Sequence, residues 1–556
     1  MTYSFDRFLR YDELTTWLHD TAAAHPHLMT VESYGRSHQG RDLWIATLTD
    51  SNTGEHHTKP AHWVDANIHS VEVTAGVAAL SLINTLVSGF ESDDTVTRAL
   101  QTRTFYVVPR VNPDGVEWAL ADSPQYRRSS TRPWPWRDAH QAPGLHMRDI
   151  DGDGRVLSMR VADPNGSWTP SALDPRVMAP VPIDGLPVGA SRYRLLYEGE
   201  LVDHDGFTVP QPRPPEGLDM NRNFPAGWGT EVRGSGDHPL SEPEIDALVR
   251  ALVARPNVCG YNAYHTSGGV LLRPSSTKAD SSLAPLDVWT WKQLGERGQA
   301  LTGYTVHSVF EDFTWDKSDT MSGAADDWAY EHLGVFSWTT EFWDVVHAAT
   351  GTKQSTHFWY TGPTEAEEVA IAAWSDEHGY DMFVPWYEFQ HPQLGQVELG
   401  GWDDMHTWTN PPLALLANEV HGHAEFAIFQ ALAAPSVEVI DVSAVALGGD
   451  TWRIEARIAN TGYLPTHVTE HAKKRNLVLP TVAVLEGVEV LGGPARLELG
   501  QLAGRLAARF GAGSDGTPDR RLATWVVRGS AGDSVTIAVS HQRGGTATAT
   551  VTLGAS

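Results

Sequence analysis

Two histidines and two glutamates stand where apolar strands end in the sequence, and together they could bind and use a divalent metal ion. His69 and Glu72 lie three residues apart, between a short strand pattern that ends near Asn67 and a helical pattern. His265 closes the apolar run VCGYNAYH, and Glu341 ends a second run, VFSWTTE. Because open α/β sheets keep their sites at the carboxyl ends of strands, we expect these side chains to meet at one edge.

His69, Glu72 and His265 form a His₂Glu set with an open fourth position, which is the ligand set of a catalytic zinc hydrolase, and Glu341 supplies the base that such a site needs. Each residue also has an ordinary interpretation. With 25 His and 69 acidic residues in 556, chance supplies roughly three His-x-x-acid pairs. His265 could be an ordinary histidine at the end of a strand, with its hydrogen bonds made to neighbouring groups, and Glu341 could be the acid of a salt bridge.

The composition restricts the partners and the chemistry. A single cysteine, Cys259, excludes an internal disulfide and a cysteine-based zinc site. The net charge of −28 disfavours nucleic acid and anionic membranes as partners.

Charged residues, among them Asp6 and Arg7, stand where a signal peptide needs an apolar run, and no apolar run is long enough to span a membrane, so we expect a cytoplasmic protein. The oligomeric state is not indicated.

Helical and strand patterns alternate over the first 120 residues, which favours an α/β fold with a mixed central sheet flanked by helices. YDELTTWLHDTAAA and VTAGVAALSLINTLV have helical periodicity, and residues 42–48 and 105–108 form strand patterns. Asn112 to Gly115 predicts a turn. A further helix is expected in SEPEIDALVRALV, where Ser241 and Glu244 have capping-box spacing.

The chain is predicted to have two domains. Residues 1–430 form the α/β domain, interrupted by a Pro-, Arg- and Trp-rich insertion at about 130–215. Residues 435–556 contain short alternating runs, such as TWRIEARI, that predict an immunoglobulin-like β-sandwich.

Six elements in a fixed order resemble the zinc metallocarboxypeptidase family, whose best-known members are the pancreatic carboxypeptidases A and B. In chain order they are NIHSVE, NPDG, Arg127, GLDMNRNFP, YHTSGG and TTEF. GLDMNRNFP is the most specific of them. The resemblance covers about residues 1–430 without the insertion and implies a zinc carboxypeptidase-like fold followed by an added β-sandwich, as in bacterial members.

The resemblance implies a metal centre with one zinc ion per chain. His69, Glu72 and His265 would bind the zinc, and Asp219 would orient a ligand histidine from behind. Glu341 would be the general base that takes a proton from the attacking water and returns it to the leaving amine.

The resemblance also implies contacts to a peptide substrate. Arg127 would polarise the scissile carbonyl and stabilise the oxyanion. Asn221 and Arg222 would hold the terminal carboxylate, which would limit cleavage to the last peptide bond. The alternatives are a solvated surface for Arg127 with its neighbour Arg128, and a turn held by Asn221.

Asp326 is a candidate for substrate selectivity. The segment SGAADDWAYEHLG resembles the specificity-pocket segment of the carboxypeptidases that remove basic residues, with Asp326 at the base of the pocket. An acid there would favour C-terminal Lys or Arg. The alternative is that Asp326 or Asp327 caps a helix beside Trp328.

Two departures from the family pattern leave the reaction open. Val71 stands where the pancreatic relatives have an arginine, and Ser318-Asp319-Thr320-Met321 stands where they have a mobile tyrosine. A same-fold zinc amidase or endopeptidase acting on a peptidoglycan stem or another modified peptide is therefore an alternative. A non-catalytic peptide-binding protein is the alternative of another class.

The insertion contains a candidate calcium loop. Asp149, Asp151 and Asp153, with glycines between them, match the first half of an EF-hand-type loop. Arg160 stands at the twelfth position, where such a loop has its bidentate glutamate. A calcium site completed by ligands from elsewhere is one interpretation, and an acidic turn without an ion is the other.

Overall fold

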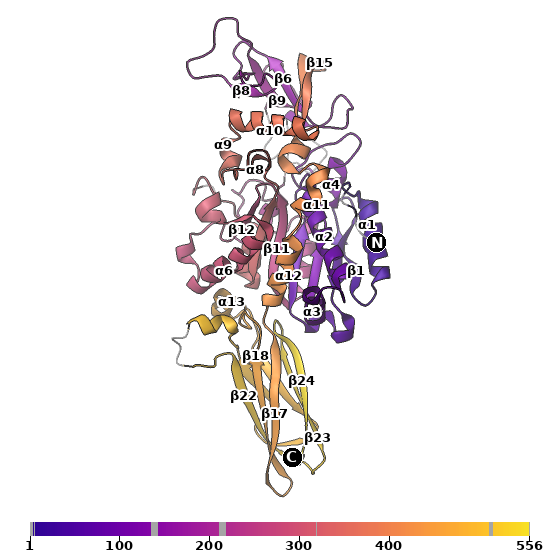
Figure 1. Cartoon of the computed structure of the whole chain (residues 1–556), viewed down its shortest axis with the longest axis vertical. Helices are drawn as coiled ribbons and strands as arrows, with labels where there is room; N and C mark the ends of the chain where they lie inside the picture. The colour runs from indigo at the N-terminus through magenta and orange to yellow at the C-terminus, as the bar shows by residue number, and fades with distance from the viewer. Residues whose placement is uncertain are drawn as a thin grey trace.

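A small upper sheet, a central α/β unit and a C-terminal β unit follow one another along the long axis of the molecule (Figure 1). The computed structural model describes residues 4, 6–134, 143–210, 218–318, 320–510 and 515–554, without the side chains of 359 and 508–510. The insertion therefore belongs to the upper sheet, at the end of the molecule opposite the C-terminus.

The central unit is built on an eight-stranded mixed sheet, which confirms the predicted fold class. From edge to edge its strands are β1 (Met29–Arg36), β2 (Asp42–Leu48), β4 (Thr104–Val108), β3 (Ala61–Ala66), β11 (Val258–Thr266), β14 (Phe336–Phe342), β12 (Val270–Arg273) and β13 (Thr305–Ser308). The four middle strands, β4, β3, β11 and β14, are parallel to one another. Their carboxyl ends therefore lie at one edge.

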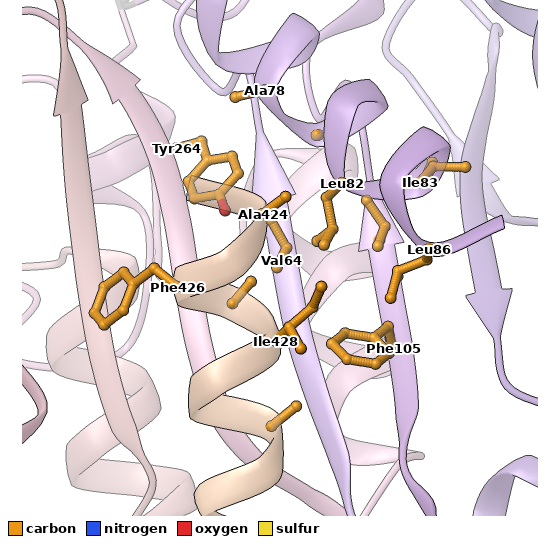
Figure 2. Close-up of a cluster of buried hydrophobic side chains, with 14 of the residues drawn as sticks. Val64, Ala78, Leu82, Ile83, Leu86, Phe105, Tyr264, Ala424, Phe426 and Ile428 are labelled. Atoms are coloured by element: carbon orange, nitrogen blue, oxygen red, sulfur yellow. The ribbon is translucent and has the colours of Figure 1, made fainter. Parts of the chain in front are cut away.

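Helices cover both faces of this sheet. On one face pack α2 (Val73–Gly89), α6 (Pro285–Thr302) and α12 (His423–Ala433), and on the other α5 (Pro243–Val253) and α7 (Ala325–Trp328). Figure 2 shows side chains of α2 and α12 meeting Val64, Phe105 and Tyr264 of the strands. Every residue of β3 and β11 is buried, as expected for parallel strands with covered faces.

The remaining helices connect or flank these elements. They are α1 (Tyr11–Ala24), α3 (Asp94–Thr102), α4 (Pro113–Ala119), α8 (Val345–Thr350), α9 (Phe358–Thr361), α10 (Glu365–His378), α11 (Leu413–Glu419) and α13 (Glu470–Arg475). The helices expected from YDELTTWLHDTAAA and VTAGVAALSLINTLV are confirmed as α1 and α2. The turn predicted at Asn112 is the start of α4 instead, because Asn112 caps that helix and Pro113 fits its first position.

The capping box predicted at Ser241 is wrong by one residue. The N-cap of α5 is Glu242, because Pro243 occupies the first helical position, where a missing backbone N–H costs nothing. Ser241 donates its hydroxyl to Glu242, and Glu244 accepts a hydrogen bond from the backbone of His38. Glu242 also accepts a hydrogen bond from the guanidinium of Arg132 at 2.7 Å, so both acids connect α5 to neighbouring segments.

The upper sheet combines two segments that are far apart in the chain. Four of its strands come from the predicted insertion: β6 (Ser158–Ala162), β7 (Trp168–Pro170), β8 (Met178–Pro180) and β9 (Tyr193–Tyr197). β15 (Phe383–His391) and β16 (Gly395–Trp402) complete it, in the order β15-β16-β6-β9-β7-β8. β5 (Gly144–Met147) and β10 (Gly199–Val202) form a separate pair. The insertion is therefore ordered around strands of its own, and it also recruits residues 383–402.

The C-terminal unit consists of two four-stranded antiparallel sheets around one core. One contains β17 (Val437–Gly448), β18 (Thr451–Asn460), β22 (Arg520–Arg528) and β20 (Glu489–Gly492). The other contains β21 (Arg496–Gly500), β19 (Thr481–Glu486), β23 (Ser534–His541) and β24 (Gly545–Thr552). The alternation predicted in TWRIEARI is confirmed, since Ile454, Ala456 and Ile458 are fully buried in that core.

Buried polar contacts join the C-terminal unit to the central one. The guanidinium of Arg543, which is 4% exposed, donates to the carbonyl oxygens of Leu333 and Gly334. The carboxylate of Asp287 in α6 accepts the backbone N–H groups of Glu470 and His471, at 2.7 and 3.0 Å, and so caps α13. Arg543 and Asp287 are both buried where the two units meet.

Within the described residues no single helix passes the length and hydropathy test for a membrane span. Only the pair α2 and α3, bent by 100° at its break, passes it jointly.

Candidate metal centre

His69, Glu72 and His265 come from three elements that converge at the carboxyl ends of the central strands. His69 lies in the loop after β3, Glu72 is the N-cap residue of α2, and His265 lies near the end of β11. Asn67 holds the loop: it has a positive φ of 61° and donates its side-chain amide to the carbonyl oxygen of His69 at 2.7 Å. The strand-end prediction therefore holds for the positions of all three side chains.

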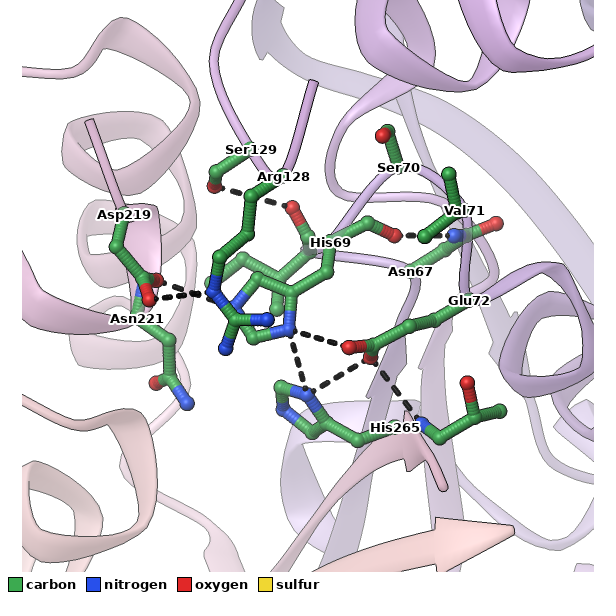
Figure 3. Close-up of polar contacts among 12 residues, drawn as sticks. Asn67, His69, Ser70, Val71, Glu72, Arg128, Ser129, Asp219, Asn221 and His265 are labelled. Atoms are coloured by element: carbon green, nitrogen blue, oxygen red, sulfur yellow. Dashed lines mark hydrogen bonds and ion pairs between the residues drawn. The ribbon is translucent and has the colours of Figure 1, made fainter. Parts of the chain in front are cut away.

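The three side chains present one ligand atom each to a common point (Figure 3). Nδ1 of His69 lies 2.8 Å from Oε1 of Glu72, and Nδ1 of His265 lies 3.1 Å from Oε2 of the same carboxylate. The two Nδ1 atoms are 3.2 Å apart. Two nitrogens bound to one tetrahedral zinc at about 2.0–2.1 Å lie about 3.3 Å from each other, so the donor set fits this ion.

Asp219 supports His69 from the side away from the ligand cluster. Its Oδ1 lies 3.0 Å from Nε2 of His69, and its Oδ2 accepts a hydrogen bond from Nε of Arg128 at 2.9 Å. Burial opposes the charged form of Asp219, but Arg128 and His69 outweigh it and hold its pKa well below the usual range. This contact orients the imidazole so that Nδ1 faces Glu72.

Glu341 lies next to the ligand cluster on the neighbouring parallel strand. In the register of β11 and β14 it is paired with His265, and its side chain lines the same cavity as the three ligands. Burial raises the pKa of Glu341 well above the usual range, the Glu72 carboxylate raises it further, and Arg128 lowers it. A carboxyl group that lies close to a metal position and resists ionisation suits proton transfer.

The two adjacent arginines face different surroundings. Nη1 of Arg127 lies 3.2 Å from Nδ1 of His146, and its guanidinium lies 6.0 Å from the ring of Trp118. Arg128 instead contacts Asp219 and lines the cavity of the ligand cluster together with Glu341. Figure 3 shows Arg128 beside His69. Of the two, Arg128 is the one that adjoins the candidate metal position.

The cavity around the ligands has a volume of about 300 Å³ and also contains the predicted substrate residues Asn221, Arg222 and Asp326. Oδ1 of Asn221 accepts the backbone N–H of Ala325 at 2.9 Å, so this side chain also fixes the loop before α7. Asp326 is 3% exposed and accepts the backbone N–H of Asp327 at 2.9 Å. Burial raises the pKa of Asp326, as expected for a carboxyl group removed from water.

A larger outer cavity of about 770 Å³ adjoins the first, and His69, Arg128 and Arg222 line both. Ser318, Thr320 and Met321, which stand where the tyrosine is missing, line the outer cavity, while Asp319 lies outside the described residues. Tyr360 of α9 lines both cavities and is 50% exposed. Neither Arg128 nor Tyr360 was among the predicted site residues.

The sequence contained a signal for one of these two residues. Arg128 directly follows the predicted Arg127, so the pair marked the right segment but not the right side chain. Tyr360 lies beyond the last recognisable motif, TTEF, and only the packing of α9 brings it to the cavity. No local pattern distinguishes it from the other tyrosines of the chain.

The candidate calcium loop is a tight turn with internal hydrogen bonds. The carboxylate oxygens of Asp149 accept the backbone N–H groups of Gly152 and Gly154 at 2.6 and 3.0 Å. Asp151 and Asp153 each accept a backbone N–H two residues further on. Although the three carboxylates lie within 4.8 Å of one another, these contacts are those of an acidic turn, and calcium stays a prediction without further support.

Comparison with protein families matches most of the central unit and nearly all of the C-terminal unit. Residues 14–169 and 177–361 match the model described as zinc carboxypeptidase. Residues 436–552 match a model described as a domain of unknown function. The first match contains every candidate metal, catalytic and substrate residue named above, from His69 to Glu341.

Individual relatives share shorter segments. A zinc carboxypeptidase of Saccharothrix mutabilis subsp. capreolus is 33% identical over 111 residues, which are 20% of this chain and 25% of that protein. Carboxypeptidase B of Astacus astacus is 28% identical over 159 residues, 29% of this chain and 44% of that protein. The crystal structure of carboxypeptidase A from Helicoverpa armigera superposes with a TM-score of 0.40 and 18% identity, covering 67% of this chain and 74% of that one. The chain thus spans less than half the length of these two curated relatives.

Proposed function

Because the chain belongs to the zinc carboxypeptidase family, we propose that it is a zinc-dependent carboxypeptidase that hydrolyses the C-terminal peptide bond of peptides. One observation carries the proposal: three ligand atoms of His69, Glu72 and His265 converge, and Glu341 lies beside them on the adjacent strand. A zinc ion held there would supply a Lewis acid and a water molecule of lowered pKa. The chain's own residues supply the remaining functions.

Glu341 takes the proton of the attacking water and later gives it to the leaving amine. Its position beside His265 brings the carboxylate to the ligand cluster, within reach of a water molecule bound there. Asp219 keeps His69 oriented during this exchange through the contact at its Nε2. Glu341 lines the cavity of the metal ligands, and Asp219 contacts His69 from the side away from the other ligands.

An unbiased peptide library tests this function. The zinc-loaded protein is incubated with peptides of mixed sequence, and mass spectrometry identifies the products. Loss of single C-terminal residues supports the proposal. Internal cleavage, or release of a modified stem, would favour the alternative amidase or endopeptidase, which the absence of tyrosine from 318–321 keeps open. Binding without any product would identify a peptide-binding protein.

Arg128 is the residue that we propose to stabilise the oxyanion. The sequence-based prediction assigned this role to Arg127, but Arg127 faces His146, whereas Arg128 lines the cavity with Glu341. A guanidinium is always charged and presents a planar set of donors to the developing charge. Asn221 and Arg222, on the same cavity wall, are proposed to hold the substrate carboxylate.

We expect Arg128→Ala to lower kcat/KM by about 10²–10³-fold, the usual effect of losing one oxyanion donor, and Arg127→Ala to lower it by less than about tenfold. Initial rates on one peptide measure both variants. Zinc content, determined by elemental analysis, should remain at one per chain in each. The opposite ranking of the two variants would return the role to Arg127.

Asp326 is proposed to select a basic C-terminal residue. The carboxylate of Asp326 is buried, and no cation pairs with it among the described residues. A lysine or arginine side chain of the substrate would supply the positive charge that pairs with it. We expect Asp326→Asn to lower kcat/KM about 100-fold for peptides ending in lysine and to leave peptides ending in leucine within about threefold. Asparagine keeps the acceptor for the Asp327 backbone, and the exposed Asp20→Asn serves as control. An equal loss on both peptides would contradict this assignment.

A further inference from the structure

A third cavity, of about 440 Å³, lies between the upper sheet and the helices α9 and α10. Aromatic side chains are prominent in its wall, among them Trp168, Tyr197, Phe383, Trp386, Trp402 and Trp408. They support one another: the ring of Trp402 meets Phe383 at 4.9 Å and Trp408 at 5.4 Å, both edge to face. We call this cavity the aromatic cleft.

Two carboxylates in the wall of the aromatic cleft lack a cationic partner among the described residues. Oε2 of Glu368 accepts the indole N–H of Trp402 at 2.9 Å, and no ion pair is formed by Glu368 or by Asp404. Burial raises the pKa of Glu368 to about 7 and that of Asp404 to about 6, with further contributions from the neighbouring acids Glu365 and Asp403. A cation between the rings would favour the charged form of both carboxylates.

The one arginine in the wall of the cleft does not serve as that cation. The guanidinium of Arg176 is bound by Asp174 at 2.7 Å and by Asp376 at 2.8 Å. Its charge is therefore already balanced by two carboxylates. Arg176 also lies over the ring of Phe383 at 5.9 Å, and Arg160 lies over the ring of Trp386 at 4.5 Å. Among the described residues no cation lies over Trp168, Trp402 or Trp408, and these rings with the two uncompensated acids form an arrangement that attracts an ammonium or guanidinium group.

The aromatic cleft adjoins the cavities of the metal centre. Tyr197 and Asp404 line both the cleft and the outer cavity, and the outer cavity shares His69 and Arg128 with the cavity of the metal ligands. A peptide bound with its last residue toward Asp326 would extend from the metal position into the outer cavity. Its upstream residues would then reach the cleft.

We propose that the aromatic cleft is a second cation-binding subsite, which holds a lysine or arginine side chain of the peptide on the N-terminal side of the cleaved bond. The proposal rests on the proposed function for the direction in which the peptide lies. It assigns a task to the upper sheet, which contributes Trp386 and Trp402 from one segment and Trp168 and Tyr197 from the other.

A set of peptides that differ only in the position of one lysine tests this subsite. All end in the same C-terminal lysine, and a second lysine is placed at each of positions two to six before the cleaved bond, with norleucine elsewhere. We expect the zinc-loaded full-length protein to prefer one or two of these positions by about tenfold in kcat/KM, and the double variant Glu368→Gln/Asp404→Asn to lose that preference. The double variant Glu377→Gln/Asp20→Asn, which removes the same two charges from exposed positions, should retain it. No positional preference, or one that survives in the double variant, would overturn the proposal.

A binding measurement separates failure of the subsite from failure of the proposed function. The zinc-loaded Glu341→Gln protein is titrated with the same peptides while its tryptophan fluorescence is recorded, and Kd should rise about tenfold when Glu368→Gln/Asp404→Asn is added. If the peptides bind with this preference but the wild type cleaves none of them, the proposed function fails and the subsite stands. If N-acetylglucosamine oligomers change the fluorescence and lysine position has no effect, the cleft is a sugar site and the proposal fails.

Discussion

Glu341→Gln is expected to lower kcat by about 10³-fold, within the range of general acid–base catalysis, and to leave one zinc ion per chain. The amide has the shape of the carboxylate but cannot take a proton from water or return one to the amine. Because Glu341 is not one of the three converging ligands, the metal should stay bound. Initial rates on a peptide ending in lysine, with zinc measured by elemental analysis, determine both quantities.

The exposed Glu388 of β15 provides the matched control for this variant. Glu388→Gln removes the same charge from a residue that lines none of the three cavities, so its kcat should equal that of the wild type. Retention of most of the activity in Glu341→Gln would remove Glu341 from the proposed mechanism. Loss of zinc in that variant would instead make Glu341 a ligand.

His265→Ala is expected to abolish turnover by a different route, through loss of the metal. Removing one of three ligands leaves His69 and Glu72 to hold the ion, and we expect the zinc dissociation constant to rise by more than about 100-fold, beyond the effect usual for an outer-shell residue. Competition with a chromogenic chelator measures this constant. Excess zinc should restore little activity, because the vacated position leaves the site short of a nitrogen donor.

Asp219→Asn and His57→Ala complete this comparison. Asp219 contacts His69 from behind, so its variant should raise the zinc dissociation constant by about 10–100-fold, less than His265→Ala. His57 is exposed and precedes β3, whereas the ligands lie beyond the other end of that strand, and His57→Ala should bind zinc as the wild type does. Unchanged zinc affinity in His265→Ala would contradict the His₂Glu assignment.

The sequence predicted the central sheet and the ligand cluster because both depend on local patterns. Each ligand stands at the end of a buried strand or the start of a helix, and the carboxyl ends of parallel strands meet at one edge. The pairing of His265 with Glu341 follows from the same rule once β11 and β14 are neighbours. The position of these side chains is thus a consequence of periodicity and chain order.

The parts that could not be predicted depend on contacts between distant segments. Arg127 and Arg128 have the same side chain and adjacent positions, and their different partners, His146 for Arg127 and Asp219 for Arg128, come from distant parts of the chain. The pairing of β6 with β16 joins strands that stand before and after His265 and Glu341 in the chain. Strand register of that kind is set by tertiary packing and leaves no signal in either segment alone.

The composite upper sheet also has a consequence for synthesis of the protein on the ribosome. About 200 residues separate the end of β9 from the start of β16. At 5–20 residues per second, roughly 10–40 s therefore pass between the synthesis of β9 and that of β16, the second partner strand of β6. During that interval β6 presents an open edge, which is a template for pairing with other chains. The emerging polypeptide therefore contains all its metal ligands before its upper sheet can form completely. We expect slower translation or a lack of chaperones to lower the yield of folded protein in a foreign host.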